Sequence, residues 1–164
     1  MARLLKRESF EPGAAKPVMS IPNPTVYIVD DDDAVRDSLR CLLESYEFTL
    51  RDYACADDFL ADKQSGKTGC LLLDLHMPGM TGLQLLGKLR RDGYRLPVIA
   101  ITGRNDRELK KQVAQAGAFA LLEKPMNHDI LIWTIRNAVA PKSLPAIGGN
   151  QTDESTRNSG MLPT

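Results

Sequence analysis

The chain has 164 residues, and its 21 lysines and arginines balance 21 aspartates and glutamates, so the formal net charge is zero. A chain without net positive charge lacks the electrostatic basis for using nucleic acid or an anionic membrane as its main partner. The longest unbroken apolar run, residues 118–122, is too short for a membrane helix or a signal peptide, so we expect a cytoplasmic protein.

The prolines separate a central domain from two flanks. Seven of the ten prolines lie outside residues 25–140, and the flanks carry no helical or alternating apolar pattern. We expect residues 1–24 and 141–164 to be disordered, with one folded domain between them.

The domain opens with a short apolar strand at 25–29, which ends in a run of acidic residues. A helix follows, with apolar residues at helical spacing from Val35 to Tyr46, and Asp32 or Asp33 is the expected N-cap. The next strand, 49–53, is weakly marked. A short helix at 57–64 should bury Phe59 and Leu60.

Residues 70–73 are apolar on both faces of a strand that ends at Asp74, as expected inside a covered parallel sheet. The remaining pattern predicts helices at 81–91, 106–116 and 127–139 and strands at 97–101 and 118–122. Leu83, Leu86 and Leu89 should face inward from the first of these helices, and Leu109, Val113 and Ala116 from the second. Gly117 should provide a left-handed C-terminal cap.

Five alternating strand–helix units predict an α/β fold with an open, doubly wound parallel sheet. The common strand order 2-1-3-4-5 makes the first and third strands neighbours. Ligands bind such sheets beyond the carboxyl ends of the strands, so the residues at those ends are the candidate site.

Five polar residues follow the strands at that edge: Asp30, Asp31, Asp74, Thr102 and Lys124. Carboxylates from neighbouring strands would repel one another, so a cation should lie between them. Mg²⁺ fits, because it takes a few oxygen ligands and keeps water positions for a phosphate.

The same residues suit phosphoryl transfer to an aspartate. Lys124 and the metal would neutralise the transferring oxygens, and Thr102 would bind one of them. Asp74 stands alone at its strand end and is the expected nucleophile, whereas Asp30 and Asp31 are better placed as metal ligands.

Four segments resemble the receiver domain of two-component response regulators. They are Val29-Asp30-Asp31-Asp32, the run from Leu73 to Gly82 (LDLHMPGMTG), Ile101-Thr102-Gly103 and Glu123-Lys124-Pro125. They occur in the family's order, and the likeness covers essentially all of residues 25–140. In detail they look closest to regulators of the nitrogen-fixation and nitrate-response kind.

The resemblance implies a flavodoxin-like fold and a phosphoryl group accepted on Asp74 from a sensor histidine kinase or a phosphotransfer protein. It also implies Mg²⁺ bound by Asp31, Asp74 and the backbone carbonyl of His76, with Asp30 bound through water. Such a chain is a phosphoacceptor with at most slow self-dephosphorylation, not an enzyme in the usual sense. The family's Lys-Pro peptide is commonly cis, which is expected here for Lys124-Pro125.

One departure concerns the output switch. Receivers usually place Tyr or Phe three residues before the lysine, and the ring moves inward with the switch threonine, here Thr102. This chain has Leu121 at that position, and Phe119 is the nearest ring. The resemblance therefore supports phosphorylation more strongly than it supports an aromatic relay.

The last predicted helix carries a core stripe of Leu131, Ile135 and Ala138, which turns Ile130 and Trp133 away from the core. An outward tryptophan beside an isoleucine suggests a partner surface. Receivers that associate through their fourth and fifth helices make a homodimer a natural expectation here.

Three functions remain open. The first is a receiver that acts through protein–protein contacts. The second is the receiver part of a longer DNA-binding regulator. The third is a hydrolase of the haloacid dehalogenase class, because Val29-Asp30-Asp31-Asp32 also fits its D-x-D motif with Asp30 as nucleophile.

The three cysteines, Cys41, Cys55 and Cys70, form no CxxC pair, and we expect reduced, buried thiols.

Overall fold

The computed structural model describes residues 24–63, 68–104 and 106–140. The two expected flanks, apart from Pro24, and the predicted helix end at Gln64 lie outside these residues. Within them the elements are β1 (Thr25–Val29), α1 (Asp33–Glu44), β2 (Thr49–Tyr53), α2 (Ala56–Ala61), β3 (Cys70–Asp74), α3 (Gly82–Arg91), β4 (Val98–Thr102), α4 (Arg107–Gln115), β5 (Ala120–Glu123) and α5 (His128–Val139).

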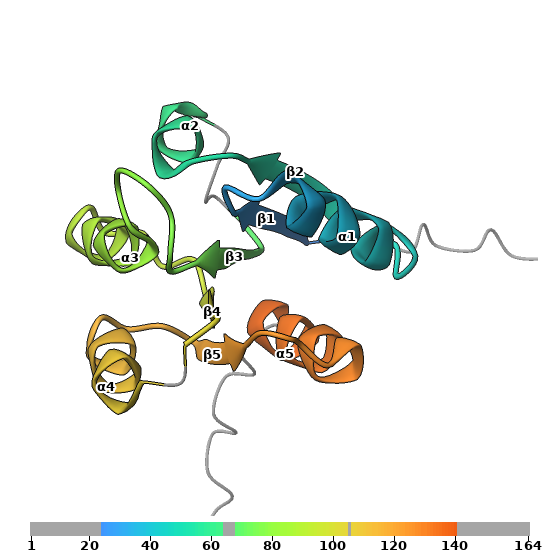
Figure 1. Ribbon diagram of the computed structural model, residues 1–164. Coiled ribbons are helices and arrows are strands. Elements are labelled where there is room, and N and C mark those ends of the chain that lie inside the picture. Colours follow the sequence, from blue (N-terminus) through green and yellow to red (C-terminus); the bar gives the residue numbers. More distant parts are fainter. Residues whose placement is uncertain (1–23, 64–67, 105, 141–164) are drawn as a thin grey trace, which may run out of the picture.

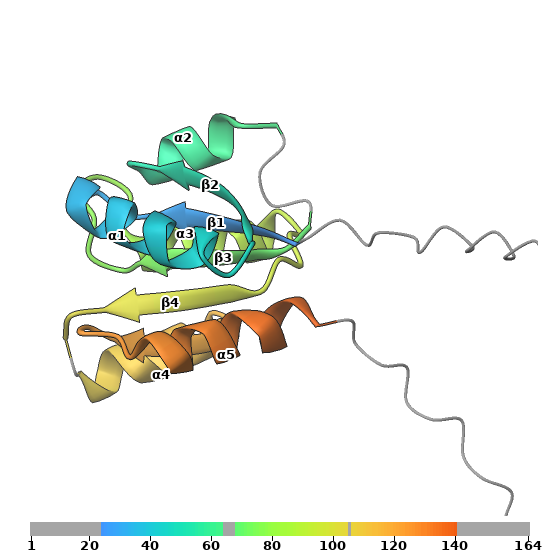
Figure 2. The same cartoon turned by 90° about the vertical axis from the view of Figure 1, so that its right-hand side faces the viewer.

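The strands form one parallel sheet in the order β2-β1-β3-β4-β5, which confirms the predicted topology. The arrowheads of the labelled strands point to the same end of the sheet (Figure 2). The chain reverses its direction of winding between β1 and β3, so the two strands that end in Asp30 and Asp74 are neighbours.

Helices cover both faces of the sheet, with α1 and α5 on one side and α2, α3 and α4 on the other (Figure 1). The two layers of the core reflect strand alternation: Ile28 and Leu72 pack toward α1 and α5, whereas Tyr27 and Leu71 pack toward α2 and α3. All five residues of β3 and all five of β4 are buried. The central strands are therefore the most protected part of the fold.

Side chains cap the helices that begin near the predicted site. Asp32 accepts hydrogen bonds from the first turn of α1, as predicted for this acidic run. Thr81 and Gln84 form a capping box at the start of α3, and Asn127 caps α5. Gly117 has a φ of 81°, as predicted for the residue after α4.

The structure corrects several details of packing. β5 starts at Ala120 rather than 118, because the backbone amide of Ala118 still donates to Val113 in α4. α1 ends at Glu44, so Tyr46 is not part of its buried stripe and is 39% exposed. In α3 the predicted Leu86 and Leu89 are fully buried, but the third inward residue is Leu85, because Leu83 is only half-buried.

The expectation of buried cysteines holds for only one of the three. All three thiols are free, but Cys41 is exposed, Cys55 is half-buried and Cys70 is buried. Cys41 lies on α1 outside the face formed by Leu39 and Leu43, which explains its exposure. In the described part of the chain, no helix has the length and apolar character needed to cross a membrane.

Candidate functional site

The end of β1 places two carboxylates side by side in sequence but in different environments. Asp30 is 1% exposed, and its Oδ1 accepts the backbone amide of Asp32 at 2.9 Å. Its own backbone amide donates to the carbonyl of Tyr53 on β2. Asp31 is exposed beside it. The Asp30 carboxylate is thus fixed by the fold, whereas the Asp31 residue is exposed to solvent.

Asp74 is the last residue of β3, and it is 5% exposed. It pairs with Ile101 across the β3–β4 register, and the following amide, of Leu75, donates to the Ile101 carbonyl at 2.9 Å. One oxygen each of Asp30, Asp31 and Asp74 lie within 4.8 Å of one another. The structure therefore brings together the three predicted carboxylates.

Lys124 follows β5 and reaches this group of acids. Its ammonium lies 3.2 Å from Asp30 Oδ2 and 3.5 Å from Asp74 Oδ1. Its backbone amide donates to the Thr102 carbonyl at 2.8 Å, which fixes the base of the side chain against β4. The Lys124-Pro125 peptide is cis, as expected.

Burial and charge act in opposite directions on these groups. Burial raises the pKa of Asp30 and the charge of Asp74 adds to it, and together they outweigh the Asp32 amide and Lys124, which lower it. Burial lowers the pKa of Lys124, but the carboxylates of Asp30 and Asp74 outweigh it, so this pKa is raised. Asp30 and Asp74 pair with this ammonium and Asp31 adds a third carboxylate, so the group of acids is short of positive charge.

Thr102 is fully buried at the end of β4. Its hydroxyl accepts the backbone amide of Arg104 at 3.1 Å and lies 3.3 Å from the Arg104 carbonyl, while the Arg104 side chain is exposed. Because β4 neighbours β3, the hydroxyl belongs to the same edge of the sheet as Asp74.

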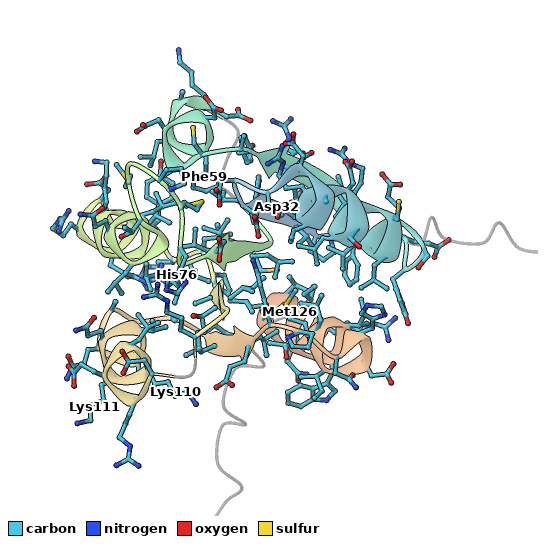
Figure 3. All side chains as sticks on the ribbon, in the orientation of Figure 1. Asp32, Phe59, His76, Lys110, Lys111 and Met126 are labelled. Atoms are coloured by element: carbon cyan, nitrogen blue, oxygen red, sulfur yellow. The ribbon has the colours of Figure 1, made fainter. Side chains whose placement is uncertain are left out.

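The segments after the strands surround this edge. Figure 3 labels Asp32, His76 and Met126, which follow β1, β3 and β5 and lie around the centre of the view. The side chain of His76 is exposed.

The other predicted residues lie away from the carboxylates. Leu121 is half-buried and packs against the small cluster that contains Val113. Ile130 is 54% and Trp133 67% exposed on α5, so both face away from the core as predicted.

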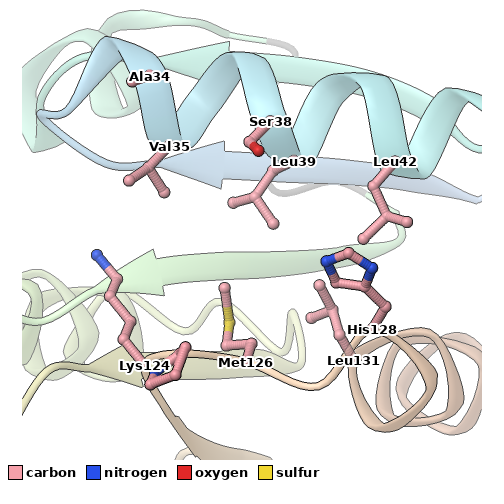
Figure 4. Close-up of a pocket in the computed structure, with 10 residues that line it drawn as sticks. Ala34, Val35, Ser38, Leu39, Leu42, Lys124, Met126, His128 and Leu131 are labelled. Carbon is pink, nitrogen blue, oxygen red and sulfur yellow. The ribbon is translucent and has the colours of Figure 1, made fainter.

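Sequence reasoning missed a groove beside the site. It has a volume of about 400 Å³ and lies between α1 and the segment from Lys124 to Leu131. Figure 4 shows Val35 and Leu39 of α1 opposite Met126 and Leu131, with Lys124 at one end. Nothing in the local pattern of either segment signals the groove, because it depends on how the two helices are spaced.

Two further residues near the acids were not predicted as parts of the site. Arg36 donates to the backbone carbonyl of Asp30 at 2.7 Å. Gly82 packs so closely on β3 that a Cβ there would lie 2.1 Å from the Asp74 carbonyl oxygen. Gly82 is part of the motif quoted above, but only the fold shows the close contact that requires glycine.

Comparison with known proteins identifies a family. Residues 26–136 match the response regulator receiver domain family. The chain is 38% identical over 116 residues to the transcriptional regulatory protein TdiR of Thauera aromatica, covering 71% of this chain and 51% of TdiR. It is 39% identical over 111 residues to the transcriptional regulatory protein FixJ of Azorhizobium caulinodans, covering 68% of this chain and 53% of FixJ.

Solved structures give the same result. The crystal structure titled FixJ-N has a TM-score of 0.67 at 35% identity, covering 73% of this chain and 95% of that one. The response regulator StyR has a TM-score of 0.66 at 35% identity, covering 72% of this chain and 60% of that one. The chain spans just over half the length of the TdiR and FixJ proteins that it matches.

Proposed function

Because the chain belongs to the response regulator receiver domain family of two-component systems, we propose that it accepts a phosphoryl group on Asp74 from a sensor histidine kinase or a phosphotransfer protein. The observation that carries this proposal is the convergence of Asp74 with Asp30 and Lys124 from the ends of three different strands. The carboxylate is held at a buried strand end, with a cation beside it and a second acid within reach.

The donor set fits Mg²⁺. Three carboxylates supply hard oxygen ligands within 4.8 Å of one another, and one ammonium leaves them with a net negative charge. We assign Asp31, Asp74 and the backbone carbonyl of His76 as direct ligands, with Asp30 acting through water. When bound, the ion would neutralise charge on the transferring phosphoryl oxygens.

In the proposed reaction, one carboxylate oxygen of Asp74 attacks the phosphorus of the donor in line with the bond to the imidazole nitrogen. That nitrogen–phosphorus bond breaks as the oxygen–phosphorus bond forms, so the electron pair returns to the imidazole and an acyl phosphate remains on Asp74. Lys124 stands 3.5 Å from Asp74 and can pair with a phosphoryl oxygen in place of the lost carboxylate charge.

Thr102 and Leu121 are our proposed switch. The Thr102 hydroxyl is engaged with the Arg104 backbone, so it must leave that contact to donate to a phosphoryl oxygen on Asp74. Movement of β4 and its following loop would open space beside Leu121, which is only half-buried. A leucine has no ring to carry the signal, so the relay depends on its rotamer.

We propose that the output acts through protein–protein contacts and includes a homodimer through α4 and α5. Of the four large hydrophobic residues exposed in the described ranges, Phe119, Ile130 and Trp133 belong to the β5–α5 part of the chain. Ile130 and Trp133 are both on α5, and exposed apolar residues on one helix favour a partner over water.

Transcriptional control is a second candidate, because TdiR and FixJ are called transcriptional regulatory proteins and the chain spans just over half of each. It would make this receiver one part of a longer DNA-binding regulator. Reading the genomic frame beyond codon 164 tests this: a continuing frame that encodes a helix-turn-helix supports it, and a stop codon there contradicts it.

Acetyl phosphate and Mg²⁺ test the proposed function directly. The protein should gain the mass of one phosphoryl group, and Asp74→Asn should gain none. No gain in the wild-type protein, or an unchanged gain in Asp74→Asn, would contradict the assignment. Mapping the adduct to Asp30 would instead favour the haloacid dehalogenase reading of the first acidic motif.

A further inference from the structure

We propose that Arg36 is a positioning residue for the metal site: it fixes the peptide between Asp30 and Asp31 and thereby sets the affinity for Mg²⁺. This inference rests on the proposed function, because it concerns the same carboxylates. It adds a residue that touches neither the ion nor the phosphoryl group.

Arg36 connects three parts of the fold through one guanidinium group. Its Nη1 donates to the Asp30 carbonyl at 2.7 Å, and its Nε lies 3.6 Å from Asp52 Oδ2 on β2. Its Nη2 pairs with Asp33 in the first turn of α1. The side chain is only 13% exposed, so the group is held in place rather than solvated.

The contact with Asp30 completes the fixation of that residue. Its amide donates to Tyr53, one side-chain oxygen accepts from the Asp32 amide, and the other faces Lys124. The carbonyl is the remaining polar group, and Arg36 binds it. Each polar group of Asp30 therefore has a partner from the fold.

The carbonyl of Asp30 lies in the same rigid peptide plane as the amide of Asp31. Fixing that carbonyl therefore fixes the direction in which the chain enters Asp31. Asp31 itself is exposed, so the orientation of this peptide plane is what presents its carboxylate to the ion. Without Arg36, the plane could rotate, and the ligand would have to be ordered when the ion binds.

The position and the charge of Arg36 predict opposite changes in Mg²⁺ affinity when this residue is lost. Removing a nearby positive charge would tighten binding of a cation, whereas loosening a ligand would weaken it. The charge of Arg36 is matched by Asp33 and Asp52, so its field at the site is small. We therefore expect the loss of position to dominate.

Arg40 provides a matched control, because it also pairs with Asp52, through Oδ1, from one turn further along α1. Its side chain is 42% exposed, and it contacts Asp52 rather than the Asp30 carbonyl. Arg36→Gln and Arg40→Gln thus remove the same type of charge from the same ion-pair network, but only the first removes the anchor of Asp30.

Calorimetric titration of the full chain with Mg²⁺ tests the proposal, with folding of each variant checked by thermal melting. Arg36→Gln should weaken binding roughly tenfold, as is typical for residues that orient metal ligands. Arg40→Gln should stay within about twofold of wild type. If Arg36→Gln fails to fold, Arg36→Lys takes its place and should also weaken binding, because an ammonium cannot bridge the Asp30 carbonyl and Asp52 together.

Phosphorylation by acetyl phosphate gives a second readout. In Arg36→Gln the Mg²⁺ concentration at half-maximal rate should rise by the same factor, while the rate at saturating Mg²⁺ stays near wild type. Unchanged or tighter binding in Arg36→Gln, or equal weakening in Arg40→Gln, would overturn the inference. If the wild-type protein bound no Mg²⁺, or if the Asp31→Asn variant bound Mg²⁺ as tightly as wild type, the proposed function would be overturned instead.

Discussion

The ammonium of Lys124 lies 3.2 Å from the carboxylate of Asp30, although 94 residues separate them in the chain. The contact crosses the carboxyl edge of the sheet from β5 to β1 and passes over the two central strands. It joins the last strand of the fold to the first through the site itself.

Lys124→Met should therefore destabilise the metal-free protein at neutral pH. Asp30 would lose its cation while remaining buried, and an unmet buried polar group costs roughly 1–3 kcal/mol. Urea unfolding measures the change. Addition of Mg²⁺ should recover much of the loss, because the ion supplies positive charge to the same oxygens; a variant as stable as wild type without Mg²⁺ would contradict the role of this pair.

The raised pKa of Asp30 predicts that Asp30→Asn stabilises the metal-free protein. Folding raises this pKa above its ordinary value of about 3.8, so the ionised carboxylate is less favourable in the folded state than in the unfolded chain. The cost is present above the folded pKa and disappears as the pH falls below the unfolded value.

The gain in melting temperature from Asp30→Asn should accordingly be greatest near neutral pH and vanish in acid. Thermal melts from pH 3 to pH 8 without Mg²⁺ measure it. With Mg²⁺ bound, the wild-type protein should melt at a higher temperature than Asp30→Asn, because the Asp30 carboxylate stabilises the bound ion. A gain that persists unchanged at pH 3 would show that burial of this charge is not its cause.

Substitution of two glycines of α3 by alanine should have opposite effects on stability. Gly82→Ala would place a methyl group 2.1 Å from the Asp74 carbonyl oxygen, so α3 must move away from the end of β3. We expect a large loss of stability and slower phosphorylation. In Gly87→Ala the nearest atom to the new Cβ is the end of the Arg91 side chain at 4.0 Å, and alanine should stabilise the helix by about 0.5–1 kcal/mol. Chemical denaturation of both variants provides the measurement.

Trp133→Ala should leave the melting temperature nearly unchanged, because 67% of the residue is exposed. If α4 and α5 form the homodimer interface, the same substitution should abolish the mass increase seen by light scattering after treatment with acetyl phosphate. Tyr46→Ala removes another exposed aromatic residue, beside the end of α1, and should preserve that increase. A mass increase that persists in Trp133→Ala would exclude Trp133 from the interface.

The existence and order of the strands could be predicted, and the bounds of the first three closely, because their signals are local. The apolar runs of the strands that end at Val29 and Asp74 are continuous. The edge of a parallel sheet at which ligands bind follows from the topology alone. Helix faces were less certain: a three- or four-residue spacing fits Leu83 as well as Leu85, and only the neighbouring cluster decides which one is buried.

The supporting residues of the site could not be predicted, because their partners are distant in the chain. Arg36 contacts the Asp30 carbonyl and Asp52 on β2, and the residue spacing of α1 predicts neither contact. Gly82 was visible as part of a motif, but its close approach to Asp74 exists only after β3 and α3 have packed. The sequence thus predicts the candidate reacting groups but not the residues that hold them in place.

The burial of every residue of β3 has a consequence for how long a phosphoryl group on Asp74 can survive. A strand flanked by β1 and β4 and covered by helices is released only when the whole domain unfolds, so its amides should be among the slowest to exchange with deuterium. Transient opening of the domain would therefore contribute little to hydrolysis of the proposed acyl phosphate. Its lifetime would be set by how water approaches from the loops, and substitutions there could change it without disturbing the sheet underneath.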